Sequence, residues 1–310
     1  MREILEAIDA AAAAGEDAVV ATVVATRRSA PRPVGAKLVV TSGGKLVGSV
    51  SGGCVEADVA ERARAIMAGA PPEVVQYGIT DSEAWDVGLA CGGELDVFIE
   101  RADLDVWRDV RTLLDADEHG VLLTDLATGE QRLERSAVEE ADLRDGVFAE
   151  PIAPPLQLIV FGATDVAEHL CAYAAQLGWR TLVIDPRGAL ATPERVPSAG
   201  EVVVAWPDQA ADRIDEHSAV VSLTHEERLD VPALAVALER GAWYVGALGA
   251  KRTQAKRREA LAARGFSDAD LDRISGPAGL ALGSREPAEM ALAIAGEIVA
   301  LRNRVPAAAA

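Results

Sequence analysis

Two cysteines stand in glycine-rich segments and are the residues of this chain best suited to bond-forming chemistry. Cys54 lies in Gly48-Ser49-Val50-Ser51-Gly52-Gly53-Cys54-Val55-Glu56, and Cys91 lies 91 − 54 = 37 residues later in Leu89-Ala90-Cys91-Gly92-Gly93. A cysteine thiolate binds soft metals and accepts sulfur. The rival interpretation is that each is a small buried residue where glycines let segments pack closely.

The segment before Cys54 has the composition of an anion-binding loop. It leads from a predicted strand into a predicted helix, and Ser51, Gly52 and Gly53 supply backbone N–H groups that can converge on an anion, with Cys54 at the rim and Glu56 beyond it. Neither cysteine has a partner at C-x-x-C spacing, which excludes a structural zinc site. Cys171, the third cysteine, lies inside a predicted helix and is expected to pack.

A basic segment precedes this loop. Residues 27–37 carry four positive charges, including Arg32 and Lys37, and no negative one, in a chain whose net charge is -19. An anionic ligand would be drawn to it, although a solvated basic loop is the alternative. The overall charge argues against a broad nucleic-acid surface.

A dinucleotide-binding turn is present in altered form at residues 162–165. Gly162 follows a predicted strand and opens a helix, and Asp185 ends the next strand 185 − 162 = 23 residues later. Thr164 replaces the second glycine of the pattern, and Asp165 either repels a phosphate or caps the helix together with Glu168. Asp185 either receives a ribose hydroxyl or ends its strand before a turn.

The order of elements predicts two α/β domains, at residues 1–150 and 151–310, joined by a linker at Pro151, Pro154 and Pro155. The first is expected to be mixed α+β, with an opening helix at 1–15, strands at 18–26, 36–41, 45–50, 74–77 and 95–100, helices at 55–68 and 104–117, and a hairpin around 125–129.

The second domain alternates strands and helices, which predicts a Rossmann-like, doubly wound parallel sheet. We expect strands at 156–161, 181–185, 201–205, 219–223 and 243–246, helices at 166–177, 231–240, 251–264 and 287–302, and a frayed tail at 305–310. His225 follows one of these strands at the ligand-binding edge of such a sheet, unless Thr224 simply caps the next helix. The basic helix at 251–264 either docks a partner or is solvated.

Composition restricts the protein class further. No uncharged apolar run approaches the roughly 18 to 20 residues that cross a bilayer, and residues 1–15 contain acidic side chains unlike a signal peptide. Three cysteines are too few for a disulfide framework. We therefore expect a cytoplasmic protein that binds no membrane and no nucleic acid.

Taken together, these segments resemble the xanthine dehydrogenase accessory protein family, XdhC/CoxI. The resemblance lies in Ser29-Ala30-Pro31-Arg32, Gly35-Ala36-Lys37, residues 48–56 and residues 89–93, and in the second half in Thr224-His225, residues 244–249, Lys251-Arg252-Thr253, residues 276–280 and residues 286–289.

The resemblance implies a chaperone, without turnover of its own, that binds the molybdenum cofactor, supports its sulfuration by a cysteine desulfurase and inserts it into a molybdenum hydroxylase apoenzyme. It also implies a homodimer. On this view Cys54 and Cys91 contact the metal, while the cofactor-binding residues are expected to be Arg32, Lys37, Ser51, Gly52, Gly53, Cys54, Glu56, Cys91, Gly92, Gly93, Gly162, Asp185 and His225.

Two other functions stay open on the sequence. The Gly162 turn and Asp185 suit an NAD(P)-dependent oxidoreductase, although no Tyr with a following Lys suggests a hydride-transfer site. Alternatively, Cys54 and Cys91 form the reversible disulfide of a redox sensor, which requires their Cα atoms to approach within about 7 Å.

Overall fold

The computed structural model describes residues 1–28, 30–78, 93–136, 138 and 140–303. The chain divides into two compact units, Met1–Pro154 and Pro155–Ala310. Within the described residues, no helix is long and apolar enough to cross a membrane.

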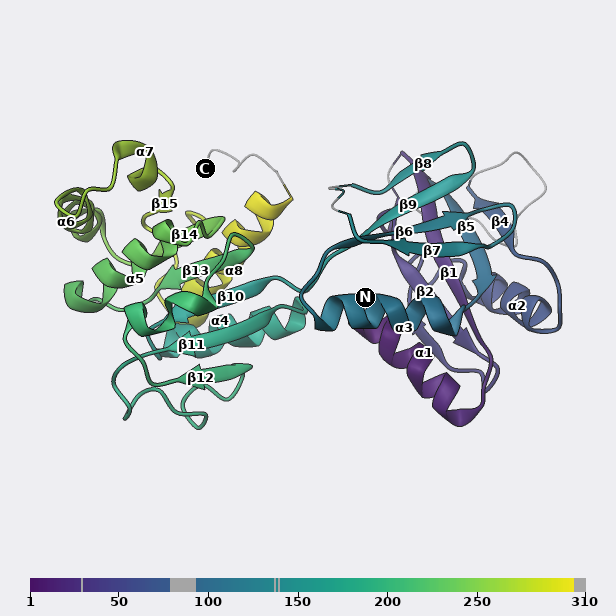
Figure 1. Ribbon diagram of the computed structural model, residues 1–310, viewed down its shortest axis with the longest axis horizontal. Coiled ribbons are helices and arrows are strands. Elements are labelled where there is room, and N and C mark those ends of the chain that lie inside the picture. Colours follow the sequence, from purple (N-terminus) through teal and green to yellow (C-terminus); the bar gives the residue numbers. More distant parts are fainter. Residues whose placement is uncertain (29, 79–92, 137, 139, 304–310) are drawn as a thin grey trace. The chain divides into compact units, whose positions relative to one another are not determined.

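The first unit is a mixed α and β structure with two antiparallel sheets (Figure 1). The five-stranded sheet has the order β3-β2-β1-β5-β4, and the four-stranded sheet has the order β7-β6-β9-β8. Its elements are α1 (Arg2–Ala14), β1 (Ala18–Arg27), β2 (Lys37–Thr41), β3 (Leu46–Gly48), α2 (Glu56–Met67), β4 (Glu73–Tyr77), β5 (Glu94–Arg101), α3 (Leu104–Asp115), β6 (Gly120–Asp125), β7 (Gln131–Glu134), β8 (Asp142–Arg144) and β9 (Val147–Ile152).

The five-stranded sheet is buried on both faces, which explains its nearly continuous apolar strands. Val19, Ala21 and Val23 of β1 pack with α2, whereas Val20 packs with α1 and α3 on the opposite face. This alternation follows from the two-residue repeat of a strand. The second face also meets the four-stranded sheet, through a small apolar cluster that includes Phe148 of β9.

Of the four-stranded sheet, only the hairpin around 125–129, which joins β6 and β7, was predicted from the sequence. Pro151, assigned above to the linker, lies in β9 and pairs with Val121 of β6. β8 pairs only with residues 147–149, so β9 is an edge strand at Pro151, where a residue without an N–H group is tolerated.

The second unit contains one parallel sheet of order β12-β11-β10-β13-β14-β15, which confirms the predicted Rossmann-like fold (Figure 1). Its elements are β10 (Gln157–Phe161), α4 (Asp165–Gln176), β11 (Arg180–Ile184), β12 (Glu201–Val203), the 3-10 helix η1 (Pro207–Arg213), β13 (Ser218–Ser222), α5 (Glu227–Glu239), β14 (Tyr244–Ala247), α6 (Lys251–Ala262), α7 (Asp268–Leu271), β15 (Ile274–Ser275) and α8 (Pro287–Arg302).

Helices cover both faces of this sheet. α4 and α8 pack on one face, and α5, α6 and η1 pack on the other. The strand order reverses between β10 and β13, so the loops after these two strands flank the point where folds of this kind bind ligands. The short elements η1, α7 and β15 were not predicted.

Candidate functional site

The loop before α2 is folded around its own carboxylate, that of Glu56. Oε1 of Glu56 accepts hydrogen bonds from Ser49 Oγ at 2.6 Å and from the N–H groups of Val50 at 3.2 Å and Ser51 at 2.9 Å. Oε2 accepts from Ser51 Oγ at 2.5 Å and from the N–H groups of Gly53 at 2.9 Å and Val55 at 3.2 Å. The predicted convergence of N–H groups on an anion is present, and the anion belongs to the protein.

The remaining N–H groups of the loop are also satisfied internally. Gly52 donates to Ser49 Oγ at 2.7 Å, and Cys54 donates to Ser51 Oγ at 2.9 Å. Gly52 and Gly53 have φ of +79° and +116°, a conformation that glycine adopts without strain and that turns these N–H groups inward. The loop therefore offers its backbone donors to Glu56 and not to an external phosphate.

The electrostatics of Glu56 reflect this arrangement. Burial opposes ionisation of the carboxyl group, but hydrogen bonds from Ser49 and Ser51 outweigh it and lower the pKa from 4.5 to about 2. Glu56 is also the first residue of α2, where the helix dipole favours a negative charge. The residue is thus an ionised anchor for the loop throughout the physiological pH range.

Cys54 is left exposed at the outer side of this loop. It lies one residue before Val55, the N-cap of α2, and its thiol is free. Cys171 is buried, as predicted, and burial raises the pKa of its thiol to about 12. Of the cysteines in the described residues, Cys54 alone presents its sulfur to an incoming ligand.

Cys91 and Gly92 lie outside the described residues, so the predicted pairing of Cys91 with Cys54 stays a prediction. Gly93 is described and is buried just before β5. Among the residues that the structure describes, no group of three or more His, Cys, Asp and Glu side chains is arranged to hold a metal ion.

The basic segment at 27–37 is largely neutralised within the fold. Arg27 makes two hydrogen bonds to Asp96, at 3.1 and 2.9 Å, and Arg28 lies 3.7 Å from Glu94. Arg32 is exposed and forms no ion pair with any described residue. Arg32 is therefore the cation of this segment that stays available to an anionic ligand.

Lys37 is buried and faces the protein interior instead of a ligand. Its Nζ donates to Glu150 Oε2 at 2.6 Å and to Thr22 Oγ1 at 3.1 Å, and it lies 5.9 Å from the centre of the Trp107 ring. Both charged side chains of the Lys37–Glu150 pair are less than a tenth exposed. An unpaired buried charge is costly, which explains why the two are held together.

Glu100 adds a second buried carboxyl group to this region. Burial raises its pKa to about 8, Lys37 opposes that rise, and the nearby Glu150 and Asp103 add to it. Its Oε1 accepts a hydrogen bond from Gln131 Nε2 at 2.8 Å.

Glu150 was not predicted as a site residue because β9 was not predicted. Every second residue of this strand is buried, namely Phe148, Glu150 and Ile152. A glutamate at a buried position of an otherwise apolar, alternating strand would have been the sequence signal for this residue.

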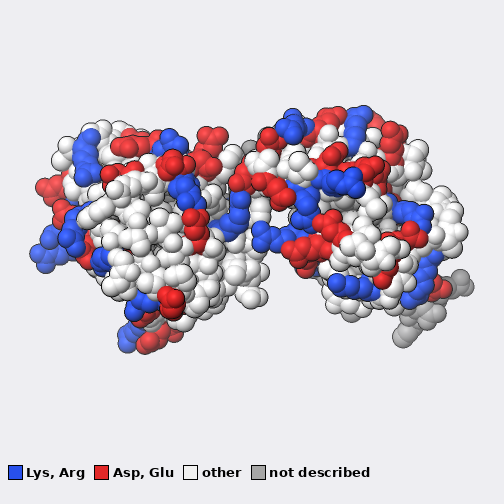
Figure 2. Space-filling model, turned by 60° about the horizontal axis from the view of Figure 1, so that its bottom comes forward, with Lys and Arg blue, Asp and Glu red and all other residues white. Residues whose placement is uncertain are grey.

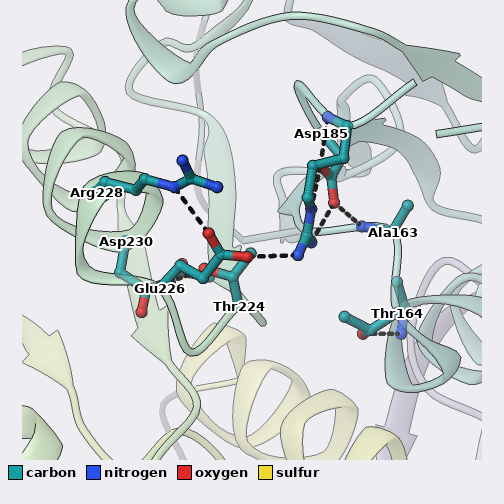
Figure 3. A network of polar contacts seen from close by, with 10 residues as sticks. Ala163, Thr164, Asp185, Thr224, Glu226, Arg228 and Asp230 are labelled. Atoms are coloured by element: carbon teal, nitrogen blue, oxygen red, sulfur yellow. Dashed lines mark hydrogen bonds and ion pairs between the residues drawn. The ribbon is translucent and has the colours of Figure 1, made fainter. Parts of the chain in front are cut away.

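The altered dinucleotide turn of the second unit is closed by its own side chains (Figure 3). Asp185 is fully buried, and its Oδ2 accepts the N–H of Ala163 at 3.0 Å. Thr164 Oγ1 caps α4 by accepting the N–H of Ala167 at 3.3 Å. Gly162 has φ of +109°, and an added Cβ would lie 2.6 Å from the Thr224 methyl group. The N–H group of Ala163, which would face a pyrophosphate in a dinucleotide-binding turn, is therefore already bonded to Asp185.

The expectation that Asp165 and Glu168 form a capping pair is wrong. Thr164 is the N-cap, and Asp165 is an exposed first residue of the helix, 3.6 Å from Arg195. Glu168 instead accepts from the N–H group of Ser198 at 3.1 Å and from its hydroxyl at 2.7 Å. Threonine takes the cap because its hydroxyl reaches the free N–H group of the first turn.

Arg187 ties the loops after three neighbouring strands together. It donates to Asp185 through Nε at 2.9 Å and Nη2 at 2.6 Å, and to Glu226 through Nη1 at 2.8 Å. Glu226 also accepts from Arg228 Nε at 2.8 Å, as Figure 3 shows. Burial opposes ionisation of Asp185, but the bonds from Arg187 and Ala163 lower its pKa. Asp185 therefore holds this loop cluster, and its carboxylate is not free for a ribose.

His225 and Thr224 lie at the same edge of the sheet and differ in environment. His225 is exposed, whereas Thr224 is buried and donates its hydroxyl to Asp230 of α5. Glu226 is the N-cap of α5, so the suggested capping role of Thr224 is wrong.

The basic helix α6 is solvated in part only. Lys251, Arg252 and Lys256 are exposed, as a solvated face requires. Arg257 is buried against Asp230, and it also donates to the carbonyl groups of Leu248 at 2.6 Å and of Thr224. Arg257 consequently joins the loops after β13 and β14, a structural role that sequence patterning alone did not predict.

Charged side chains of both signs share the surface of each unit. On the face drawn in Figure 2, Lys and Arg are interspersed with Asp and Glu, and the described residues form no wide basic area there.

Both halves of the chain match models of one known protein family. Residues 11–78 match the model of the XdhC and CoxI family, and residues 158–298 match the XdhC Rossmann domain. The chain belongs to the XdhC family. The first match contains the Cys54 loop, Arg32 and Lys37, and the second contains the turn at Gly162 together with Asp185 and His225.

Individual relatives match almost the whole chain. A protein named as a probable subunit of xanthine dehydrogenase, from Bacillus subtilis, is 27% identical over 94% of both chains. A protein named molybdenum cofactor insertion chaperone PaoD, from Escherichia coli, is 28% identical over 97% of this chain and 88% of its own length. A crystal structure described as a xanthine dehydrogenase from Bacillus halodurans matches 99% of this XdhC chain and 97% of its own, with 25% identity and a TM-score of 0.81.

Proposed function

We propose that this protein is a molybdenum cofactor chaperone, which binds the cofactor as cargo and inserts it into a molybdenum hydroxylase apoenzyme of the xanthine dehydrogenase or carbon monoxide dehydrogenase type. The proposal has support from membership of the XdhC family and from the name of the Escherichia coli relative. It assigns the protein no turnover of its own. The reducing cytoplasm would keep its cysteines available as thiols.

The observation that carries the proposal is the exposed Cys54 on a loop fixed by Glu56. Thiolate sulfur suits a soft metal centre that already carries sulfur ligands. Glu56 and the two serines hold the loop in one conformation, so little conformational freedom is lost when cargo binds. A single exposed sulfur is also a fitting ligand for cargo that must leave again. We propose Cys91 as the second sulfur, supplied by its own glycine-rich segment.

Three finer parts of the proposal concern partners. A cysteine desulfurase would supply sulfur to the cofactor while this protein holds it, the hydroxylase apoenzyme would then receive it, and the chaperone would act as a homodimer. The name of the Bacillus subtilis relative suggests a permanent enzyme component instead. A chaperone would bind the cofactor-free apoenzyme and be absent from the mature enzyme, whereas a permanent component would copurify with it in stoichiometric amount.

The test uses the full chain, purified from cells that make the cofactor. Bound cofactor is oxidised to its fluorescent pterin and quantified per chain. We expect pterin on the wild-type protein and much less on Cys54→Ser and Cys91→Ser. Cys171→Ala is the control, because it removes a thiol that is buried in the core of the second unit. Equal pterin in all four proteins would disprove the cysteine assignment, and its absence from the wild type would disprove the proposal.

An NAD(P)-dependent oxidoreductase is the second candidate, because the second unit has a Rossmann-like sheet with Gly162 at the point where the strand order reverses. The contacts of Ala163 and Asp185 weigh against it, since both groups that would meet the dinucleotide are bonded to each other. Calorimetric titration with NAD and NADP decides between the functions. Micromolar affinity for either would favour the oxidoreductase.

A further inference from the structure

A surface hollow of the first unit lies beside Arg32, the cation of the basic segment that has no ion pair with any described residue. The hollow has a volume of about 550 Å³, within the range of small-molecule sites. Its lining includes one arginine and two glutamates, Arg32, Glu140 and Glu150, together with Pro33, Gly35, Ala141 and Pro151. Pro33, Ala141 and Pro151 are apolar and can flank a flat ring. Arg32 is exposed at this hollow and Glu150 is buried in its wall.

The carboxylate of Glu150 is fixed in orientation and has one oxygen to spare. The side chain is only 8% exposed, and its Oε2 is held by Lys37 Nζ at 2.6 Å. No described residue donates a hydrogen bond to Oε1. Oε1 lies beside Gly35, because a Cβ at that position would be in van der Waals contact with it, at 3.5 Å. Glu150 lines the hollow, and its Oε1 is not one of the buried unpartnered atoms of the described residues, so water or a ligand can supply the donor that the protein does not.

These groups define the chemistry of a ligand. A carboxylate accepts hydrogen bonds and cannot donate them, so Glu150 requires N–H or O–H donors. Arg32 suits a phosphate. The matching molecule is a flat heterocycle with N–H donors on one edge and a phosphate elsewhere. A pterin phosphate has both, because its pyrimidine edge carries a 2-amino group and an N3–H group.

We propose that this hollow binds the pterin end of the cargo, with Glu150 accepting from the pyrimidine edge and Arg32 contacting the phosphate. The inference rests on the proposed function, which makes a pterin-containing cofactor the cargo. Lys37 connects this hollow to the Cys54 loop, because its carbonyl accepts the N–H of Ser49 at 2.8 Å while its side chain holds Glu150. Both sites are thus anchored to Lys37 at the start of β2.

The first arm of the test changes the ligand and leaves the protein intact. Binding to the purified full chain is measured by fluorescence titration with pterin, with a side-chain phosphorylated pterin, and with lumazine, in which an oxo group replaces the 2-amino group. We expect lumazine to bind at least about tenfold more weakly than pterin, because a site built for a donor rejects an acceptor. Phosphorylated pterin should bind more tightly than pterin.

The second arm changes the protein. In Glu150→Gln the amide oxygen must face the Lys37 ammonium group, which turns the NH2 group toward the hollow, so the preference for pterin over lumazine should disappear. Arg32→Ala should reduce the affinity for phosphorylated pterin to that for pterin and leave pterin itself unaffected. Arg108→Ala is the matched control, since this exposed arginine of α3 does not line the hollow. Arg32 is exposed, so its variant tests the proposal even if Glu150→Gln does not fold.

The outcomes separate this inference from the function on which it rests. Wild-type protein that carries pterin from cells, yet binds lumazine as tightly as pterin or keeps its preference for phosphorylated pterin in Arg32→Ala, would overturn the assignment of the hollow alone. Wild-type protein that carries no pterin and binds none would overturn both proposals. Loss of each predicted preference in the matching variant would establish the hollow as the pterin site.

Discussion

Replacing Glu56 by glutamine should loosen the Cys54 loop without changing its size. The carboxylate accepts six hydrogen bonds, three at each oxygen. A glutamine can keep one set of three, but its NH2 group would then face the donors of the other set. The loop should lose about half of its hydrogen bonds to residue 56 and gain a contact between donors.

The lowered pKa of Glu56 gives the size of the expected loss in loop stability. A decrease from 4.5 to about 2 corresponds to about 3 kcal/mol at about 1.4 kcal/mol per tenfold change in proton affinity. Because the side chain is partly exposed, solvent screening reduces the expected loss in the free energy of loop opening to about 1 to 2 kcal/mol. Hydrogen exchange of the amides at 50–55 should therefore be accelerated by about tenfold at neutral pH.

Amide exchange followed by mass spectrometry measures this effect in the full chain. Glu61→Gln is the control, because Glu61 is an exposed residue of the same helix. The pKa of Glu56 is lower in the folded state, so its contribution is complete above pH 4.5 and is lost as the pH falls toward about 2. Protection of the wild-type loop should thus approach that of Glu56→Gln in acid. Equal protection of the two proteins at pH 7 would refute the anchoring role of Glu56.

Three further predictions concern the buried groups and the closed turn. The pKa of Glu100 is raised from 4.5 to about 8, so its contribution to stability is complete below pH 4.5 and is lost as the pH rises through about 8. Glu100→Gln should therefore gain stability relative to the wild type between pH 5 and pH 9 in urea denaturation, and a constant difference would contradict this. Arg187→Leu should destabilise the second unit by about 2 to 3 kcal/mol by leaving a buried carboxylate unpaired, which thermal unfolding measures against the exposed Arg228→Leu. Gly162→Ala should lower the melting temperature more than Gly178→Ala, because both glycines have positive φ but only the first has a neighbour in the way of a Cβ.

Local sequence determined those features whose partners are close along the chain. Alternating apolar strands and helices predicted the parallel sheet of the second unit, because each element must bury one face. The glycines and serines at 48–53 predicted a loop with converging N–H groups. Glu56 lies within seven residues of every donor that it binds, so the sequence contained this site, although it did not reveal that the bound anion is internal.

Tertiary structure alone decided which charges are available. Arg27 is neutralised by Asp96, 69 residues away, and Lys37 by Glu150, 113 residues away, so no local pattern could show that both are occupied. Arg32 has no ion-pair partner among the described residues, and the bond from Lys37 uses one oxygen of Glu150. Residue types therefore established that the first unit contains thiols, N–H groups and cations, whereas the pairing of distant strands selected the ones that can meet a ligand.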